Sequence, residues 1–250
     1  YQEDLADQLA VSLLAEKKEW GGLHSSCVLV QNSGLGRWLK LRQASRTGVS
    51  ACVQMPFIRA YISEHLQDAN FYSKEKTLTP ATMRWMLFEL FCQADFAMDD
   101  HRLEPLTAYL RDDPDQGEIR SWELAGDLAR LYDQYSIFRP YWLMYWLEEV
   151  DDPEEPVGMT WQRVLFRMLA EKWSGDVSGF AKTMLGPALF HYMMKFYSRP
   201  DFFSPKTEPA PLHVFGIYTY SPLFLRFLQA LSFSREVYIY HRIVSDAFLG

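Results

Sequence analysis

The residues best suited to binding chemistry follow a short apolar run near the start of the chain. The run Cys27-Val-Leu-Val30 is followed by Gln31-Asn-Ser-Gly-Leu-Gly36, a glycine-containing turn that leads into a helical pattern. A strand, a glycine turn and a helix in this order can bind phosphate at the helix N-terminus. The turn lacks the lysine of a P-loop and the third glycine of a dinucleotide-binding motif. It therefore does not indicate a nucleotide site.

The polar and aromatic side chains of this turn suit nucleic acid. Gln31 and Ser33 can form hydrogen bonds to base edges, and Arg37 and Trp38 can contact phosphate and base faces. A place in the hydrophobic core is the alternative for Trp38. Three further cations of the same region are weaker candidates for binding backbone phosphate: Lys40, Arg42 and Arg46.

A second cluster of such residues lies in the segment Arg130-Leu-Tyr-Asp-Gln-Tyr135 and the following Phe138-Arg-Pro140. The helical pattern places Asp133 and Gln134 away from the apolar stripe of this segment, and Arg139 just past the helix end. A carboxylate and an amide at these positions can contact base edges. An ion pair between Asp133 and Arg139 that only fixes the loop is the alternative.

Motifs of catalysis and metal binding are missing from the sequence. It contains no P-loop, no G-x-S-x-G serine motif and no H-E-x-x-H or C-x-x-C spacing. A later apolar run, residues 212–217, leads into Tyr218-Thr-Tyr-Ser221 where an ATPase would carry an acidic pair. Asp112, Asp113 and Asp115 could form a nuclease metal cluster, but their proline- and glycine-containing setting is typical of a turn. We predict no catalytic, cofactor or metal site in this chain.

Charge is distributed unevenly along the chain. The formal net charge is −7, which argues against binding nucleic acid through bulk positive charge. Yet the 43 residues from Gly21 to Ser63 contain no Asp or Glu and carry five cations. Ten acidic residues gather between Asp95 and Asp127, and six more between Glu148 and Glu155. The basic segment is a candidate polyanion contact, with an ordinary solvated face as the alternative.

The periodicity of apolar residues predicts an α/β fold with a parallel sheet covered by helices. Strands are expected at residues 27–30, 49–55, 212–217 and 236–241, with Pro56 in the first turn of a helix and a further helix at 222–231. The stretch from Thr79 to about Tyr197 is helical in pattern, with an interruption at Gly186-Pro187. We therefore predict an α/β part, residues 1–78 and 205–250, and an all-helical insertion, residues 79–204.

Composition indicates a folded protein of a reducing compartment. Apolar residues make up 48% of the chain, and no apolar run has the roughly 20 residues that a membrane span needs. Three cysteines are too few for a disulfide framework. We expect a cytoplasmic protein, and the missing initiator Met suggests that Tyr1 is an internal start.

Three blocks of the sequence resemble one known family. The blocks Val28–Leu39, Asp127–Trp142 and Val214–Leu231 are similar, in order and spacing, to the N-terminal part of the gamma chain of exodeoxyribonuclease V, the RecC family. The resemblance covers essentially the whole chain. It implies a motif-decayed superfamily 1 helicase fold, with the helical insertion as subdomain 1B and a first strand before Tyr1.

The same resemblance implies a function in double-strand break repair by homologous recombination. The gamma chain would bind single-stranded and forked DNA within a bacterial heterotrimer with RecB-like and RecD-like subunits, and those partners would use ATP and Mg²⁺. It would guide the 3′-ended strand and scan it for the hotspot Chi. By motif position, the scanning residues would be Gln31, Ser33, Arg37, Phe57, Leu131, Asp133, Gln134 and Arg139.

The sequence departs from the family at three positions of these blocks. Arg37 replaces an amide, Arg130 an acid and Ser63 an aromatic residue. The departures leave the recognised base sequence open. Two other functions also stay open: a purely structural scaffold, in which Gly21–Ser63 would be buried or covered by a partner, and an ATPase whose P-loop precedes Tyr1.

Overall fold

The structure, a computed structural model, describes residues 2–73, 76–93, 96, 100–112, 117–150, 158–174, 177–198 and 210–242. The chain divides into two compact units. The first, here called the sheet unit, comprises Tyr1–His65 and Met193–Gly250. The second, the helical unit, comprises Leu66–Tyr192. Each is described by itself.

The sheet unit contains four parallel strands in the order β2-β1-β3-β4. The strands are β1 (Ser26–Val30), β2 (Val53–Gln54), β3 (Leu212–Phe215) and β4 (Val237–Tyr240). Val30 is level with Phe57 in an isolated bridge and with Phe215 in β3, and Phe215 is level with Tyr240. These four residues form one row across the sheet, near the carboxyl end of every strand.

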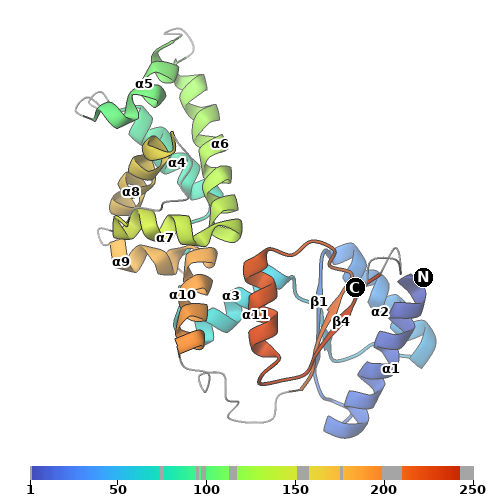
Figure 1. The fold of residues 1–250 in the computed structure, drawn as a ribbon. Helices are drawn as coiled ribbons and strands as arrows, with labels where there is room; N and C mark the ends of the chain where they lie inside the picture. Colours follow the sequence, from blue (N-terminus) through green and yellow to red (C-terminus); the bar gives the residue numbers. More distant parts are fainter. Residues whose placement is uncertain are drawn as a thin grey trace, which may run out of the picture. The chain divides into compact units, whose positions relative to one another are not determined.

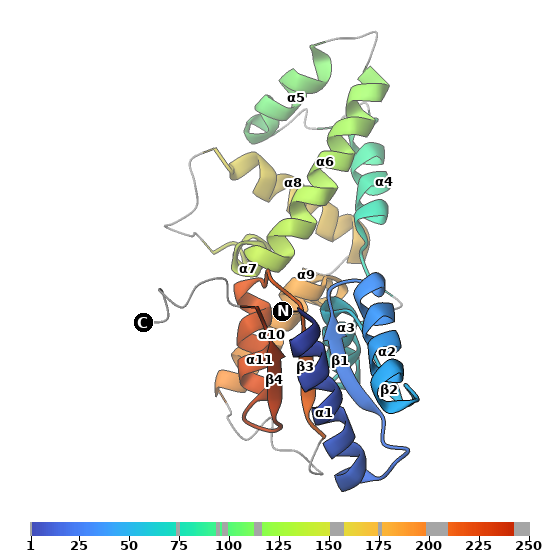
Figure 2. The same cartoon turned by 90° about the vertical axis from the view of Figure 1, so that its right-hand side faces the viewer.

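Helices cover both faces of this sheet (Figures 1 and 2). Helices α1 (Gln2–Trp20) and α2 (Ser33–Thr47) lie on one face, and α3 (Ile58–Asp68) and α11 (Pro222–Leu231) lie on the other. Leu9 and Leu13 of α1 pack with Val28, Val30 and Phe215 of the strands in one apolar cluster. Alternate strand residues thus face α1, as the period of two in a strand requires.

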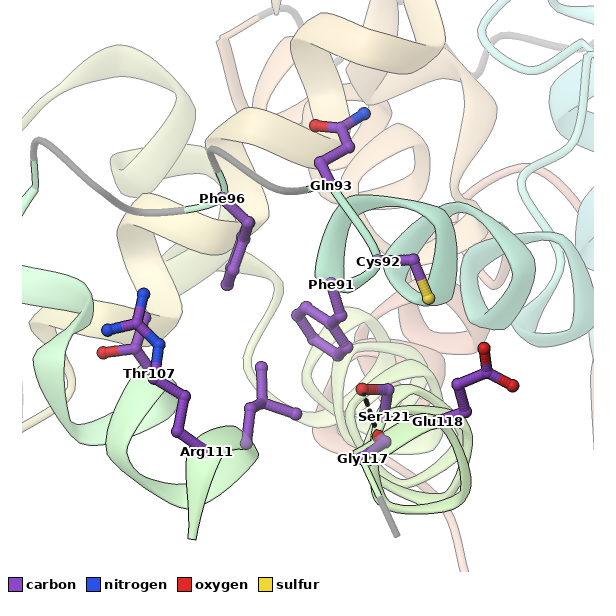
Figure 3. A pocket seen from close by; sticks show the side chains of 10 residues that line it. Phe91, Cys92, Gln93, Phe96, Thr107, Arg111, Gly117, Glu118 and Ser121 are labelled. Carbon is purple, nitrogen blue, oxygen red and sulfur yellow. Dashed lines mark hydrogen bonds between the residues drawn. The ribbon is translucent and has the colours of Figure 1, made fainter. Parts of the chain in front are cut away.

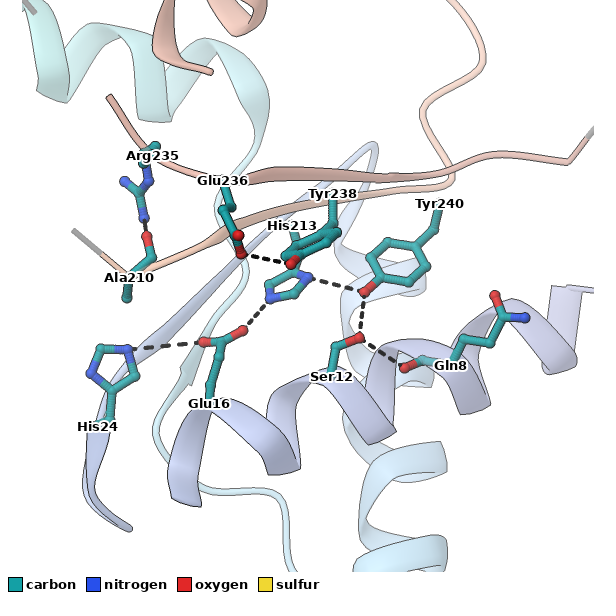
Figure 4. A network of polar contacts seen from close by, with 10 residues as sticks. All are labelled: Gln8, Ser12, Glu16, His24, Ala210, His213, Arg235, Glu236, Tyr238 and Tyr240. Atoms are coloured by element: carbon teal, nitrogen blue, oxygen red, sulfur yellow. Dashed lines mark hydrogen bonds and ion pairs between the residues drawn. The ribbon is translucent and has the colours of Figure 1, made fainter. Parts of the chain in front are cut away.

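A buried polar network fastens α1 to the sheet (Figure 4). His213 of β3 is fully buried and its Nε2 contacts a carboxylate oxygen of Glu16 on α1. Its Nδ1 lies 3.2 Å from the Tyr240 hydroxyl, which donates to Ser12 Oγ at 2.9 Å. Because a buried charge without partners is costly, this network orders α1 on the sheet.

The helical unit is built around aromatic side chains. Its helices are α4 (Pro80–Phe91), the 3₁₀ turn η1 (His101–Leu103), α5 (Glu104–Arg111), α6 (Gly117–Phe138), α7 (Pro140–Glu148), α8 (Thr160–Ser174), α9 (Val177–Phe180), the 3₁₀ turn η3 (Ala181–Thr183) and the start of α10 (Leu185–Ser198). Tyr132, Trp146 and Phe166 are buried together at its centre. The Tyr132 hydroxyl donates to the Gln162 carbonyl at 3.0 Å, so its polar atom is satisfied inside the core.

Several predicted elements are confirmed. The sheet is parallel, the first strand is β1, the two late strands are β3 and β4, and the helix at 222–231 is α11. Thr79 caps α4 by accepting a hydrogen bond from the Thr82 N–H at 3.1 Å, with Pro80 at the first helical position. The late elements begin with clear signals, because Ser221 caps α11 in the same way and Pro222 follows it.

The predicted strand at 49–55 is wrong in its bounds. β2 contains only Val53 and Gln54, because Cys52 has a left-handed φ of 54° that interrupts extended backbone. The helix expected at Pro56 begins at Ile58. The Pro56 carbonyl accepts a hydrogen bond from the Val30 N–H at 3.1 Å, which keeps Pro56 in the extended chain beside β1.

The predicted helix break at Gly186-Pro187 is displaced by two residues. The chain is extended at Met184, with φ −117° and ψ 133°, and both residues lie in the first turn of α10, where proline is tolerated. Asp113, Asp115 and most of the proline-rich turn 205–211 lie outside the described residues. The helicase-like ancestry and the boundaries at 78/79 and 204/205 stay predictions. Among the described helices, none combines the length and apolar character needed to cross a membrane.

Candidate nucleic-acid interface

The predicted DNA-contacting residues of the sheet unit lie at the carboxyl edge of the sheet. All four strands run in the same direction, so the residues that follow Val30, Phe57, Phe215 and Tyr240 emerge at one edge. The helices that follow β1 and β3, α2 and α11, lie on opposite faces. In open parallel sheets, ligands bind at such a reversal point, outside the carboxyl ends of the strands.

The turn after β1 is fixed by a helix cap. Asn32 is extended, and its Oδ1 accepts a hydrogen bond from the Leu35 N–H at 2.8 Å, so that α2 starts at once. Gln31 and Ser33 flank this cap and are exposed. Arg37 is exposed about one turn further along α2. The cap therefore holds an amide, a hydroxyl and a guanidinium on one solvent-facing segment.

The next predicted residue, Phe57, lies at the same edge. Its backbone is level with Val30, and its side chain is 46% exposed although it is fully apolar. The loops here approach closely, because a Cβ at Gly216 would lie 2.9 Å from Leu35 Cδ2. Gly216 also has a φ of 64°, which favours glycine. The structure thus brings Gln31, Ser33, Arg37 and Phe57 together on the edge of one unit.

Trp38 occupies a different environment from its neighbours. Its ring is half-buried, packs against the apolar cluster of the sheet unit and lies 6.4 Å from the Phe215 ring. This packing agrees with the alternative of a core position. A base-stacking role for Trp38 stays a prediction.

Two of the three weaker phosphate candidates are paired within the protein. Asp7 of α1 accepts hydrogen bonds from Arg42 Nε at 3.1 Å and Arg42 Nη2 at 3.2 Å, and it also pairs with Arg46. The Arg42 hydrogen bond lowers the pKa of the Asp7 carboxyl, and the same bond raises the pKa of Arg42. Lys40 is exposed on the same helix. Asp7 would compete with phosphate for Arg42 and Arg46, and Lys40 has no such competitor among the described residues.

The second predicted set lies on α6 and at the start of α7, in the helical unit. Gln134 is exposed, Asp133 is half-buried, and Leu131 packs partly against the aromatic core. The Arg139 guanidinium lies 4.5 Å from the centre of the Trp142 ring, a cation–π distance. The two sets therefore belong to different units.

A pocket of the helical unit contains none of the predicted residues (Figure 3). It lies between the end of α4, α5 and the start of α6, and its lining includes Cys92, Arg111 and Glu118. The Ser121 hydroxyl in it donates to the Gly117 carbonyl at 2.7 Å. In the described ranges, no group of three or more His, Cys, Asp or Glu side chains could hold a metal ion.

Sequence reasoning did not single out two features of the sheet unit. Asp7 precedes the acid-free segment by 14 residues, and only the packing of α1 on α2 reveals it as the partner of Arg42. Tyr218 and His241 also lie at the carboxyl edge, three residues after β3 and directly after β4. Their positions at the ends of two predicted strands could have indicated that they lie at this edge.

Comparison with known proteins identifies the family. The family model for the N-terminal domain of RecC matches residues 2–248. The chain belongs to the RecC N-terminal domain family. The resemblance seen in the sequence is thereby confirmed.

Three curated relatives carry the description "RecBCD enzyme subunit RecC". The protein of Haemophilus influenzae is 24% identical over 229 residues, which cover 85% of this chain and 20% of the relative. The protein of Escherichia coli K12 is 26% identical, with 85% and 18% covered. The protein of Mycolicibacterium smegmatis is 28% identical, with 60% and 13% covered. The chain thus spans a fifth or less of the length of these relatives.

Proposed function

We propose that this chain is a non-catalytic, DNA-binding part of the gamma subunit of an exodeoxyribonuclease V. It guides the 3′-ended single strand and scans it for a recombination hotspot during double-strand break repair. RecB-like and RecD-like subunits of a cytoplasmic complex supply the ATP- and Mg²⁺-dependent steps. Membership of the RecC N-terminal domain family supports this proposal.

The observation that carries the proposal is the composition of the carboxyl edge. Gln31 and Ser33 are exposed there beside Arg37, and the adjoining segments 31–48 and 55–63 contain no acidic residue. Amides and hydroxyls can distinguish bases, whereas a guanidinium also binds phosphate. Exposed, acid-free segments of this kind suit a polyanion whose phosphates and bases must both be bound.

The α6 residues support the proposal in a second way. Asp133 accepts hydrogen bonds only, so it suits the amino groups of cytosine or guanine, and the exposed Gln134 can both donate and accept. Arg139 presents a planar guanidinium 4.5 Å from the centre of the Trp142 ring. Such groups distinguish bases better than flexible lysines do.

The test uses Gln31→Ala and Asp133→Ala in the enzyme assembled with its partner subunits. Each change removes base contacts worth roughly 1–3 kcal/mol. This is small compared with the total free energy of binding a long strand, but it is large compared with the difference that distinguishes one short sequence from another. We expect near-normal unwinding rates and a lost or altered hotspot-dependent product length. Gln229→Ala on α11 and Glu123→Ala on α6 are the matched controls, because both side chains are exposed outside the two sets.

Two results would contradict the proposal. If unwinding collapses together with recognition, the residues hold the strand or the fold and do not scan it. If hotspot-dependent product length is unchanged in both variants while melting temperatures fall, the chain is a structural scaffold at these positions.

A further inference from the structure

Two aromatic side chains that no predicted site includes meet at the carboxyl edge. Tyr218 follows β3 and is 51% exposed, and its ring lies 5.5 Å from the ring of His241, which follows β4. The two planes are tilted by 57°. A tyrosine and a histidine on adjacent loops thus form one exposed aromatic surface, here called the Tyr218–His241 pair.

The strand register places this pair beside the predicted contacts. Phe215 is level with both Val30 and Tyr240, so Gln31 and His241 are each the first residue beyond the same row. Tyr218 is three residues beyond it on the strand between them. The three loops are neighbours because β1, β3 and β4 are adjacent in the sheet. The pair therefore continues the edge that Gln31 and Phe57 begin.

The segments that carry the pair contain cations and no acid at this edge. Arg242 follows His241 directly and is exposed, and the whole segment from Gly216 to Arg235 contains no acidic residue. The next acid, Glu236, precedes β4 and therefore lies at the opposite edge of the parallel sheet. The start of α1 extends past Tyr240 on this side of the sheet and exposes Glu3 and Asp4, so the acid-free surface is the part formed by the segments after β1 and β3. Aromatic faces next to cations are the usual composition of single-strand binding surfaces.

We propose that the Tyr218–His241 pair stacks on a base of the single strand and that Arg242 binds an adjacent phosphate. The inference rests on the proposed function, which it extends by a further contact on β3 and β4. Stacking accepts every base, because each has an aromatic face. This contact holds the strand without reading it, whereas Gln31 reads it.

The first experiment measures binding of single-stranded oligothymidine to the chain by fluorescence anisotropy. Tyr218→Ala should weaken binding about tenfold, as expected for the loss of one base–aromatic stacking contact, and Tyr218→Phe should bind like the unchanged chain. Arg242→Gln should lower the salt dependence by about 0.7 log units per decade. Phe233→Ala is the matched control, because Phe233 is 74% exposed and precedes β4, at the opposite edge.

The second experiment locates the contact directly. Oligothymidine that carries 5-iodouridine crosslinks on irradiation to aromatic side chains stacked on the base. The peptide containing Tyr218 should carry the crosslink, and Tyr218→Leu should abolish it.

The outcomes separate this inference from the proposed function. If the unchanged chain does not bind the oligonucleotide, this inference is overturned, whereas the proposed function is judged by product length in the assembled enzyme. If it binds and Arg37→Gln weakens binding, but Tyr218→Ala does not and no crosslink forms at Tyr218, only this inference is overturned. If Tyr218→Ala impairs assembly with partner subunits and leaves DNA binding intact, the pair is a protein contact and the inference is wrong.

Discussion

Among the cations of α2, one carboxylate distinguishes those that are paired with it from those that have no ion-pair partner among the described residues. Asp7 is hydrogen-bonded to Arg42 and paired with Arg46, whereas Arg37 and Lys40 are exposed on the same helix. Sequence alone predicted all four as DNA contacts, because the acid-free segment gave no reason to distinguish them. The distinction depends on a helix–helix contact, and local sequence does not encode which acid faces which arginine.

Reversing the charge of a cation on α2 should therefore affect stability at one position and DNA binding at another. Arg42→Glu places a carboxylate beside Asp7, so we expect a lower melting temperature. Its affinity for DNA should stay close to that of the unchanged chain. Lys40→Glu should leave the melting temperature unchanged and weaken binding to single strands of every sequence. Thermal unfolding and fluorescence anisotropy on the same samples provide the check; equal melting temperatures for the two variants would contradict the pairing with Asp7.

The lowered pKa of the Asp7 carboxyl also predicts how the stability of the fold depends on pH. Its folded-state pKa is lowered by Arg42, so the pair stabilises the fold above the unfolded-state pKa of about 4 and loses this effect as pH falls through the folded value. The melting-temperature difference between the unchanged chain and Asp7→Asn should shrink in that acid range. A difference that does not shrink as pH falls below about 4 would show that another interaction is responsible.

At the scale of elements, the best predictions came from segments whose ends carry local signals. Thr79-Pro80 and Ser221-Pro222 each combine a cap with a proline, and both helices begin there. β2 was extended too far because its pairing is decided by tertiary contacts: the left-handed Cys52 and the Val30–Pro56 hydrogen bond set its limits. A residue's φ and a partner strand are not visible in the seven-residue pattern of residues 49–55.

The polar network between α1 and β3 should be a major source of stability for the sheet unit. Burial raises the pKa of the Glu16 carboxyl, but the hydrogen bond from His213 acts against it and the net shift is downward. Glu16→Gln removes one partner of a buried pair, which typically costs about 3–5 kcal/mol. We expect a correspondingly lower urea midpoint at pH 7, and no change for Glu19→Gln on the exposed face of α1.

Because the pKa of Glu16 is lowered, the pH range in which its pair with His213 stabilises the fold can be predicted. The carboxylate stabilises the fold above its unfolded-state pKa of about 4.3 and loses that effect as pH falls below it. Urea midpoints of the unchanged chain and Glu16→Gln should converge in acid. Identical midpoints at pH 7 would show that the network contributes nothing to folding.

The crossing of α10 and α6 depends on one glycine. A Cβ at Gly186 would collide with the Ser136 carbonyl of α6, and that atom belongs to backbone and cannot move aside. Gly186→Ala should lower the free energy of unfolding of the helical unit by about 1–3 kcal/mol or more, the usual cost of overpacking. Gly22→Ala is the control, because a Cβ there meets nothing within 4 Å. Equal unfolding midpoints for these two variants would mean that α10 shifts away from α6 at no cost.

At the scale of the whole molecule, the sequence predicted a sheet part whose two segments are separated by a long helical stretch. The compact units of the structure divide at His65/Leu66 and Tyr192/Met193, within α3 and α10, and the predicted domain bounds at 78/79 and 204/205 stay predictions. Both helices continue through a boundary, and a helical pattern gives no sign of where one unit ends. The acid-free segment was visible in sequence, but the strand register was needed to show which of its residues lie at the carboxyl edge.

The uneven distribution of charge predicts how DNA binding by the whole chain depends on salt. A net charge of −7 would repel DNA if charge acted in bulk, and no salt-sensitive binding would follow. If three exposed cations of the sheet unit, Arg37, Lys40 and Arg242, bind phosphates, the logarithm of affinity for single strands should instead fall by about 2 per decade of salt, from about 0.7 per contact. Arg37→Gln should reduce this slope by about 0.7, and Arg46→Gln should not, because Asp7 holds Arg46. Anisotropy titrations across a range of salt concentrations measure both slopes. A slope near zero, or an equal reduction by both variants, would place the DNA contact elsewhere than at these cations.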